Sequence, residues 1–416
     1  MAIHTSSPSK LHHALALANL ERLSKHEPPK QPENEHESDP KVDRCDIVLS
    51  RLIKWSNANK SDIDESIASQ VFGGKADISW SRAFLPFMES MGMYLRDYGK
   101  LLQAWKNYRN YKANGSSNAA DLEICIHQYN AAYDPIRKLA QSWNMDYVTL
   151  CDLIHTPPDG HLDWDGPYCG AFFTTDLQQD KPFVGVAFKG TNPANPRDIF
   201  VDYNYELTDS GKYLGGTQVS LGVFTALFAE FEKVEDTAYN YIIAALESCV
   251  QKIPKASGSL VRAHVTGHSL GGSYSSFFYA QLLQDAGGLG PEVETGDEYT
   301  FGAPRVGSQA WAVYNNSVVS PSEGQSWRIV NNDDLVPQIP PTSLKPNQLD
   351  FYHIDKGMKI FSDSPPEPIS TEIGGPTPPI VNFKDFCELV KAVIDATDHL
   401  PIAYHKSIVY AIKNTK

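Results

Sequence analysis

Long apolar runs and positive charge are both scarce in this chain. No apolar run approaches the roughly 20 residues that a membrane-spanning helix requires. The 416 residues carry a formal net charge of -14 at pH 7. Because phosphate binding needs a basic face, this balance argues against nucleic acid as a partner and against simple electrostatic attachment to anionic lipid.

Cysteine is also sparse, with six residues at scattered positions. Their spacing matches neither a metal site nor a dense disulfide framework, so free thiols in a reducing compartment are expected. The first residues have no continuous apolar core of the secretory kind. These features favour a cytoplasmic location, and association with a lipid droplet or a membrane surface stays open. The six are Cys45, Cys125, Cys151, Cys169, Cys249 and Cys387.

The chain length suits one large α/β domain with an extension. Residues 1–43 are polar, Pro-rich and charged, and we expect them to be disordered. Residues 44–119 are expected to form a helical extension that packs on the main domain, which spans 120–416. A stripe of apolar residues every three or four positions from Phe84 to Trp105 predicts one helix face, either packed on that domain or touching a membrane.

Beyond this extension the hydrophobic period changes. A helical pattern from Ala120 to about Ile154 precedes two paired strands, Gly170–Phe173 and Phe183–Phe188. A long helical pattern follows over Val219–Val250, and short strands lie around Tyr299–Phe301 and Trp327–Val330. Strands separated by helices predict an α/β fold with a mainly parallel central sheet flanked by helices on both faces.

The most informative segment lies between a short strand and a helix. A glycine on each side of a serine lets the backbone turn sharply and present the hydroxyl at the top of the sheet. Such a strained turn costs about 1–3 kcal/mol, so it needs a functional reason. The segment is Gly267-His268-Ser269-Leu270-Gly271.

A serine nucleophile needs a base and a group that orients the base. Asp333 and Asp334 directly follow a strand, at the edge of the sheet where the serine turn opens. Of the later histidines, His399 precedes a final helix and His405 lies within it, and either is a candidate base. We expect His268 to point elsewhere and His353 to be structural.

Attack on an ester creates an oxyanion that needs two donors. One is the backbone N–H of Leu270, the residue after the serine. The second is expected from Thr191, in a loop that follows an early strand and that offers a backbone N–H and a hydroxyl together.

Four segments carry motifs in a recognisable order, and together they resemble the fungal-type class 3 lipases, a branch of the α/β hydrolases. The resemblance covers roughly Ala120 to the C-terminus. It implies an α/β-hydrolase fold with Ser269 as nucleophile, Asp334 as acid and Thr191 in the oxyanion hole, and it favours His399 over His405. The segments are Ala187–Thr191, Val265–Gly272, Tyr299–Gly307 and Asn332–Pro340.

The chain also departs from the family pattern. Lys189 stands where arginine is usual, and Ser220 and Val223 replace a histidine and a phenylalanine. A lid-like stretch, Asn192 to Asp202, carries Asp198-Ile199 in place of the common Asn-Trp. These changes concern the lid, the acyl preference and the behaviour at an interface, and they remove no catalytic group.

The sequence therefore predicts a serine carboxylic ester hydrolase, a triacylglycerol lipase-like enzyme that acts on acylglycerols or similar lipophilic esters without a metal or organic cofactor. Transient contact with a lipid interface is expected. A phospholipase A1 and a feruloyl-type esterase share the same machinery. A lipase-like interaction or signalling protein is the non-enzymatic alternative.

Overall fold

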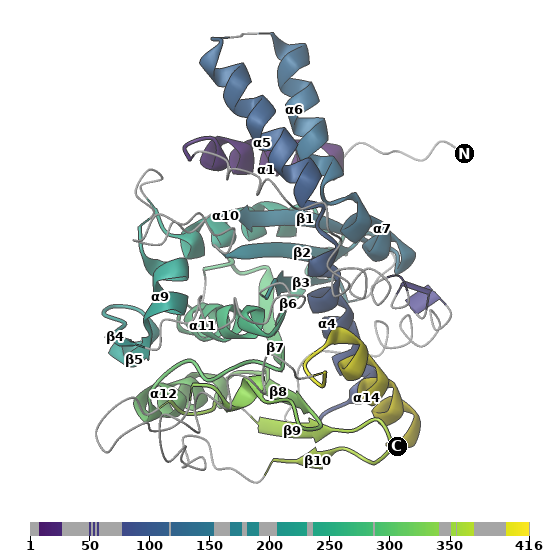
Figure 1. The fold of residues 1–416 in the computed structure, drawn as a ribbon, viewed down its shortest axis with the longest axis vertical. Coiled ribbons are helices and arrows are strands. Elements are labelled where there is room, and N and C mark those ends of the chain that lie inside the picture. The colour runs from purple at the N-terminus through teal and green to yellow at the C-terminus, as the bar shows by residue number, and fades with distance from the viewer. Residues whose placement is uncertain are drawn as a thin grey trace.

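The sheet at the centre of the molecule has helices on both of its faces (Figure 1). The structure, a computed structural model, describes residues 8–26, 50, 53–54, 56–57, 77–115, 118–153, 167–176, 181–190, 206–230, 236–285, 288–340, 351–354, 356–369 and 397–415. Its strands are β1 (Met145–Asp152), β2 (Tyr168–Thr174), β3 (Phe183–Phe188), β6 (Val261–His268), β7 (Val293–Phe301), β8 (Ser326–Asn331), β9 (Lys356–Ile360) and β10 (Glu367–Pro368). A separate pair joins β4 (Leu207–Asp209) to β5 (Gln218–Ser220).

Strand order in the large sheet is β1-β2-β3-β6-β7-β8-β9-β10. The neighbours from β3 to β9 pair in parallel, while β1, β2 and β10 join antiparallel at the two edges. The predicted pairing of the strands now assigned as β2 and β3 is confirmed, as is the mainly parallel central sheet flanked by helices. Because parallel strands end at one edge, the residues that follow β3, β6, β7 and β8 gather there.

Two apolar clusters fill the space on either face of the sheet. On one face lie α4 (Trp80–Gly92), α7 (Asp134–Ser142) and α14 (Pro401–Asn414). On the other lie α9 (Leu221–Phe228), α10 (Ala238–Val250), α11 (Leu270–Gln284) and α12 (Gln309–Val319). A hairpin of α5 (Tyr98–Ala113) and α6 (Ala119–Ala131) projects beyond the β1 edge, and α1 (Pro8–Leu23) lies across its base (Figure 1).

Two of the predicted helical patterns are interrupted in the structure. The stripe from Phe84 to Trp105 is split, since α4 gives way to a short 3-10 turn (Met93–Leu95) and Asp97 starts α5 by accepting a hydrogen bond from the backbone N–H of Lys100. The pattern over Val219–Val250 is divided between β5, α9 and α10 because Ala229 is extended. Helix periodicity alone does not reveal such breaks.

The predicted helix from Ala120 to about Ile154 is wrong at its C-terminal end. The chain forms α6 and α7, then turns at Asn144, whose φ is 58°, and enters β1. All eight residues of β1 are buried. A strand with both faces covered has no alternation of apolar and polar residues, so its period is hard to distinguish from that of a buried helix.

The predicted disorder of residues 1–43 is wrong for Pro8–Leu23, which form α1. Leu20 and Leu23 are buried in the apolar cluster on one face of the sheet, while Leu11 joins the other cluster. The remainder of the 1–43 segment, apart from residues 24–26, lies outside the described residues. The boundary at 119/120 falls after the first residue of α6, which packs on α5, and the division into domains stays a prediction.

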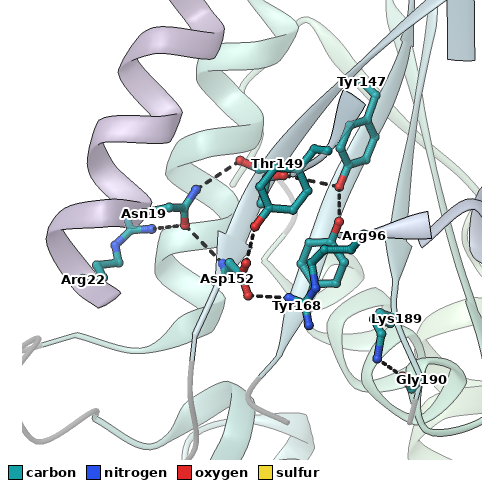
Figure 2. A network of polar contacts seen from close by, with 10 residues as sticks. Asn19, Arg22, Arg96, Tyr147, Thr149, Asp152, Tyr168, Lys189 and Gly190 are labelled. Atoms are coloured by element: carbon teal, nitrogen blue, oxygen red, sulfur yellow. Dashed lines mark hydrogen bonds and ion pairs between the residues drawn. The ribbon is translucent and has the colours of Figure 1, made fainter. Parts of the chain in front are cut away.

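A buried polar network ties α1 to the edge of the sheet (Figure 2). The amide of Asn19 donates to the Thr149 carbonyl at 3.3 Å, and its oxygen accepts from the backbone N–H of Asp152 at 3.1 Å. The Asp152 carboxylate accepts from Arg96 at 2.7 Å, and both side chains are almost fully buried. This ion pair links β1 to the segment between α4 and α5.

None of the helices in the described ranges is long and apolar enough to cross a membrane. Cys125, Cys151, Cys169 and Cys249 are free and buried. Cys45 and Cys387 lie outside the described residues.

Replacing Asn19 tests how firmly α1 is held. Asn19→Ala leaves the Asp152 N–H without its acceptor in a buried setting, so the free energy of unfolding should fall by about 1–3 kcal/mol. Hydrogen exchange at the Asp152 amide should also accelerate. Asn414→Ala removes an exposed amide contact and is the control, with an expected change within about 0.5 kcal/mol. Equal effects of the two substitutions would contradict this account.

A second test concerns His405, which lies on α14 with its ring edge against Phe84 of α4. Burial, with Lys413 nearby, lowers the pKa of His405 to about 4 from 6.5. Between those values the unfolded chain binds a proton that the folded chain does not, so stability is lost as pH falls through this window.

His405→Gln should therefore make the free energy of unfolding depend less steeply on pH between about 4 and 6.5, as measured by denaturant titration. Burial also lowers the pKa of His268 and His353, so the slope should shrink without vanishing. An unchanged slope would show that His405 does not titrate in this way.

Candidate active site

Ser269 occupies the sharp turn that joins β6 to α11. Its φ is 58°, a left-handed value that is rare for a residue with a side chain. A Cβ at position 267 would lie 2.1 Å from the Gly271 carbonyl oxygen, and one at 271 would lie 2.3 Å from the Phe188 oxygen. Both glycines are therefore required for the turn to close, as the sequence pattern predicts.

The carboxylate of Asp334 lies just beyond the end of β8 and is buried. One oxygen accepts from the backbone N–H of Val336 at 3.0 Å. The other accepts from the Tyr404 hydroxyl at 2.6 Å and from the His399 ring at 2.9 Å. Asp333, in contrast, is largely exposed and pairs with Lys359. Only one of the two candidate acids thus faces a histidine.

His399 is oriented by this carboxylate. Because a carboxylate only accepts, Nδ1 of His399 carries the proton in the bond to Asp334, and Nε2 of the neutral ring is left with its lone pair. The preceding residue is anchored too, since the side chains of Asn331 and Asn332 donate to the Asp398 carbonyl and carboxylate at 2.9 and 3.0 Å. The ring therefore has the tautomer that a general base requires.

The end of β7 brings these groups to one place. The Phe301 carbonyl accepts from the backbone N–H of Ser269 at 2.9 Å. The next residue, Gly302, has a φ of +63°, and a Cβ there would lie 2.9 Å from the Asp334 carboxylate and 3.0 Å from Cε1 of His399. Ser269, Asp334 and His399 therefore lie around the turn at Phe301 and Gly302, and no residue larger than glycine fits at position 302.

Two buried atoms beside this turn lack hydrogen-bond partners among the described residues. They are Oγ of Ser269 and Nε2 of His399. Buried polar atoms are nearly always paired, so such exceptions need an explanation. Both exceptions are explained if the Ser269 hydroxyl gives up a proton during the reaction and Nε2 of His399 accepts it. Catalytic hydrogen bonds often form fully only when substrate is bound.

The predicted oxyanion hole is described in part. Leu270 is the first residue of α11, so its backbone N–H has no acceptor within the helix. Thr191 and the lid-like stretch Asn192 to Asp202 lie outside the described residues. The chain leaves β3 beside the serine, since a Cβ at Gly190 would lie 3.0 Å from Cβ of Ser269.

The expectation that His268 points elsewhere is wrong. Its ring stacks on that of His399, with centroids 4.7 Å apart and 28° between the planes. Nε2 of His268 lies 3.1 Å from the His399 carbonyl oxygen, and Nδ1 lies 2.8 Å from the Tyr94 hydroxyl. A residue next to the serine in sequence thus supports the histidine in space.

His405, His353 and His264 lie away from Asp334. His405 faces α4, and burial with Arg328 and Arg305 nearby lowers the pKa of His353 well below its usual value. His264 belongs to β6, and Nε2 of its ring lies 2.5 Å from the carboxylate of Glu89 on α4. Of the candidate bases, only His399 contacts Asp334.

Sequence reasoning missed Tyr94, whose hydroxyl contacts His268, and Tyr404, whose hydroxyl donates to Asp334. Their positions depend on how α4 and α14 dock on the sheet, and no local motif marks them. Gly302 was recognised only as part of a family motif, although a glycine at the end of a strand is itself a signal of close backbone approach.

No group of three or more histidine, cysteine, aspartate or glutamate side chains that could hold a metal occurs within the described part of the chain.

Part of the chain is similar to known proteins. Residues 185–344 match the model of the family described as Lipase (class 3). The triacylglycerol lipase OBL1 of Arabidopsis thaliana is 26% identical over 271 residues, which cover 58% of this chain and 49% of that protein. The secreted mono- and diacylglycerol lipase 1 of Fusarium solani is 28% identical over 172 residues, which cover 41% and 43%.

The chain spans about half the length of the curated relatives it matches. Among solved structures, lipase II from Rhizopus niveus aligns with a TM-score of 0.39 and 18% identity, over 71% of this chain and 87% of that one. The family match includes Ser269 and Asp334 but ends before His399. Residues 185–344 thus match the class 3 lipase family, and the resemblance drawn from the sequence is confirmed.

Proposed function

We propose that this chain is a serine carboxylic ester hydrolase that cleaves acylglycerols or similar lipophilic esters. The observation that carries the proposal is the buried Asp334–His399 hydrogen bond beside a strained serine whose hydroxyl has no partner among the described residues. The relatives named as acylglycerol lipases supply the substrate class.

In the proposed acylation, Oγ of Ser269 attacks the ester carbonyl carbon while Nε2 of His399 takes its proton. The carbonyl oxygen becomes an oxyanion, which accepts from the N–H of Leu270 and from the backbone N–H and hydroxyl of Thr191. When the tetrahedral intermediate collapses, the bond to the alcohol oxygen breaks and the imidazolium protonates that oxygen. The acyl group is then held by Ser269 as an ester.

Water completes the cycle. His399 takes a proton from water as the oxygen attacks the acyl carbon, and the second intermediate releases the carboxylic acid while the proton returns to Ser269. Asp334 stabilises the charged imidazole in both halves and keeps its orientation. Long-chain acylglycerols separate from water, so contact with a lipid interface, at a droplet or a membrane surface, belongs to the same proposal.

A panel of mono-, di- and triacylglycerols tests the function by release of fatty acid. The wild-type chain should hydrolyse members of the panel, and Asp334→Asn should lower kcat by about 10⁴-fold because the amide no longer holds the working tautomer of His399. Asp333→Asn is the matched control, since it makes the same change on the neighbouring exposed residue.

Asp333→Asn should retain the wild-type rate. Full activity of the Asp334→Asn variant would rule out the proposed triad. A folded wild-type chain that cleaves no ester in the panel, nor a p-nitrophenyl ester, would instead favour the lipase-like interaction protein.

A further inference from the structure

Residues before the family match reach the proposed active site. Tyr94, in the 3-10 turn after α4, contacts His268, and His268 contacts His399. Position 94 lies well before residue 185, where the match to the class 3 lipase family begins. His399, the proposed base, is thus linked through His268 to Tyr94, a residue that lies outside the family match.

The direction of these hydrogen bonds can be worked out. The His399 carbonyl only accepts, so Nε2 of His268 must carry the proton in the 3.1 Å contact. Burial, with His399 alongside, lowers the pKa of His268 well below its usual value, so the ring is neutral and Nδ1 has a lone pair. The Tyr94 hydroxyl therefore donates to Nδ1.

The surroundings leave His268 little freedom to move. Its side chain is fully buried, and the rings of Tyr94 and Tyr404 meet it edge-on at 5.8 and 5.5 Å between centroids. The Tyr94 hydroxyl also packs against Gly190, where a Cβ would lie 2.6 Å from that oxygen. Tyr94 therefore contacts both His268, which bonds to the His399 carbonyl, and Gly190, at the start of the loop predicted to hold the oxyanion.

We propose that Tyr94 and His268 are positioning residues, which hold the backbone and ring of His399 so that its Nε2 stays aimed at the serine hydroxyl. The inference rests on the proposed function. Tyr94 fixes the tautomer of His268, and His268 in turn holds the loop that carries His399. Neither residue touches the reacting atoms.

Tyr94→Phe tests the proposal because it deletes the hydroxyl and keeps the ring. Without the donor, His268 can exchange tautomers and release the His399 carbonyl. Small misplacement of a catalytic group is costly, so kcat for a p-nitrophenyl ester should fall about 10- to 100-fold. KM should change by less than about twofold, since substrate binding is not involved.

Tyr279→Phe is the matched control. It removes another buried tyrosine hydroxyl, which donates at 2.9 Å to the carbonyl of Gly296, in the first half of β7, from the C-terminal half of α11. Its melting temperature should fall at least as much as that of Tyr94→Phe, while its kcat stays at the wild-type value. A purely structural role for Tyr94 would instead give the two variants the same kinetics.

Substitution of His268 gives a second measurement. His268→Gln keeps an N–H donor near the His399 carbonyl and should retain more of kcat than His268→Leu. If Tyr94→Phe keeps the wild-type kcat, or if it loses activity only in step with Tyr279→Phe, the proposal is overturned. Ser269→Ala distinguishes a failure of the positioning proposal from a failure of the proposed function, because activity in that variant would refute the esterase mechanism itself.

Discussion

The hydrogen bond from the Ser269 N–H to the Phe301 carbonyl, together with the glycine that follows, is the constraint on which the proposed site depends. It ties the turn after β6 to the end of β7. Gly302 then leaves the space into which Asp334 and His399 approach. Because β6, β7 and β8 run in parallel, their carboxyl ends meet at one edge, and groups far apart in the chain converge there.

Much of the site could be predicted from the sequence because its signals are local. Two glycines around a serine indicate the strained turn, and a carboxylate directly after a strand indicates the acid. The support of His399 could not be predicted in this way. Tyr94 and Tyr404 contact His268 only after α4 and α14 dock on the sheet, and periodicity does not encode that docking. The buried strand β1 was mistaken for helix for a related reason, since both of its faces are covered.

The segment before the family match is part of the same body as the sheet. Asn19 of α1 bonds to β1, Asp152 of β1 pairs with Arg96, and the guanidinium of Arg96 lies 4.3 Å from the centre of the Tyr98 ring (Figure 2 shows the first two links). The ammonium of Lys189 lies 5.7 Å from the same ring and donates to the Gly190 carbonyl. Where the family usually has arginine, this lysine therefore holds the end of β3 through aromatic and backbone contacts. A continuous set of packed groups thus runs from α1 to the strand end beside the serine.

Covalent trapping of the nucleophile tests the central claim most directly. A fluorophosphonate should react with the folded chain at one hydroxyl, and peptide mass spectrometry should find the phosphonyl group on Ser269 alone, with ester hydrolysis lost in proportion to labelling. A phosphonyl group on another residue, or an unmodified Ser269 in protein that has lost its activity, would contradict the account.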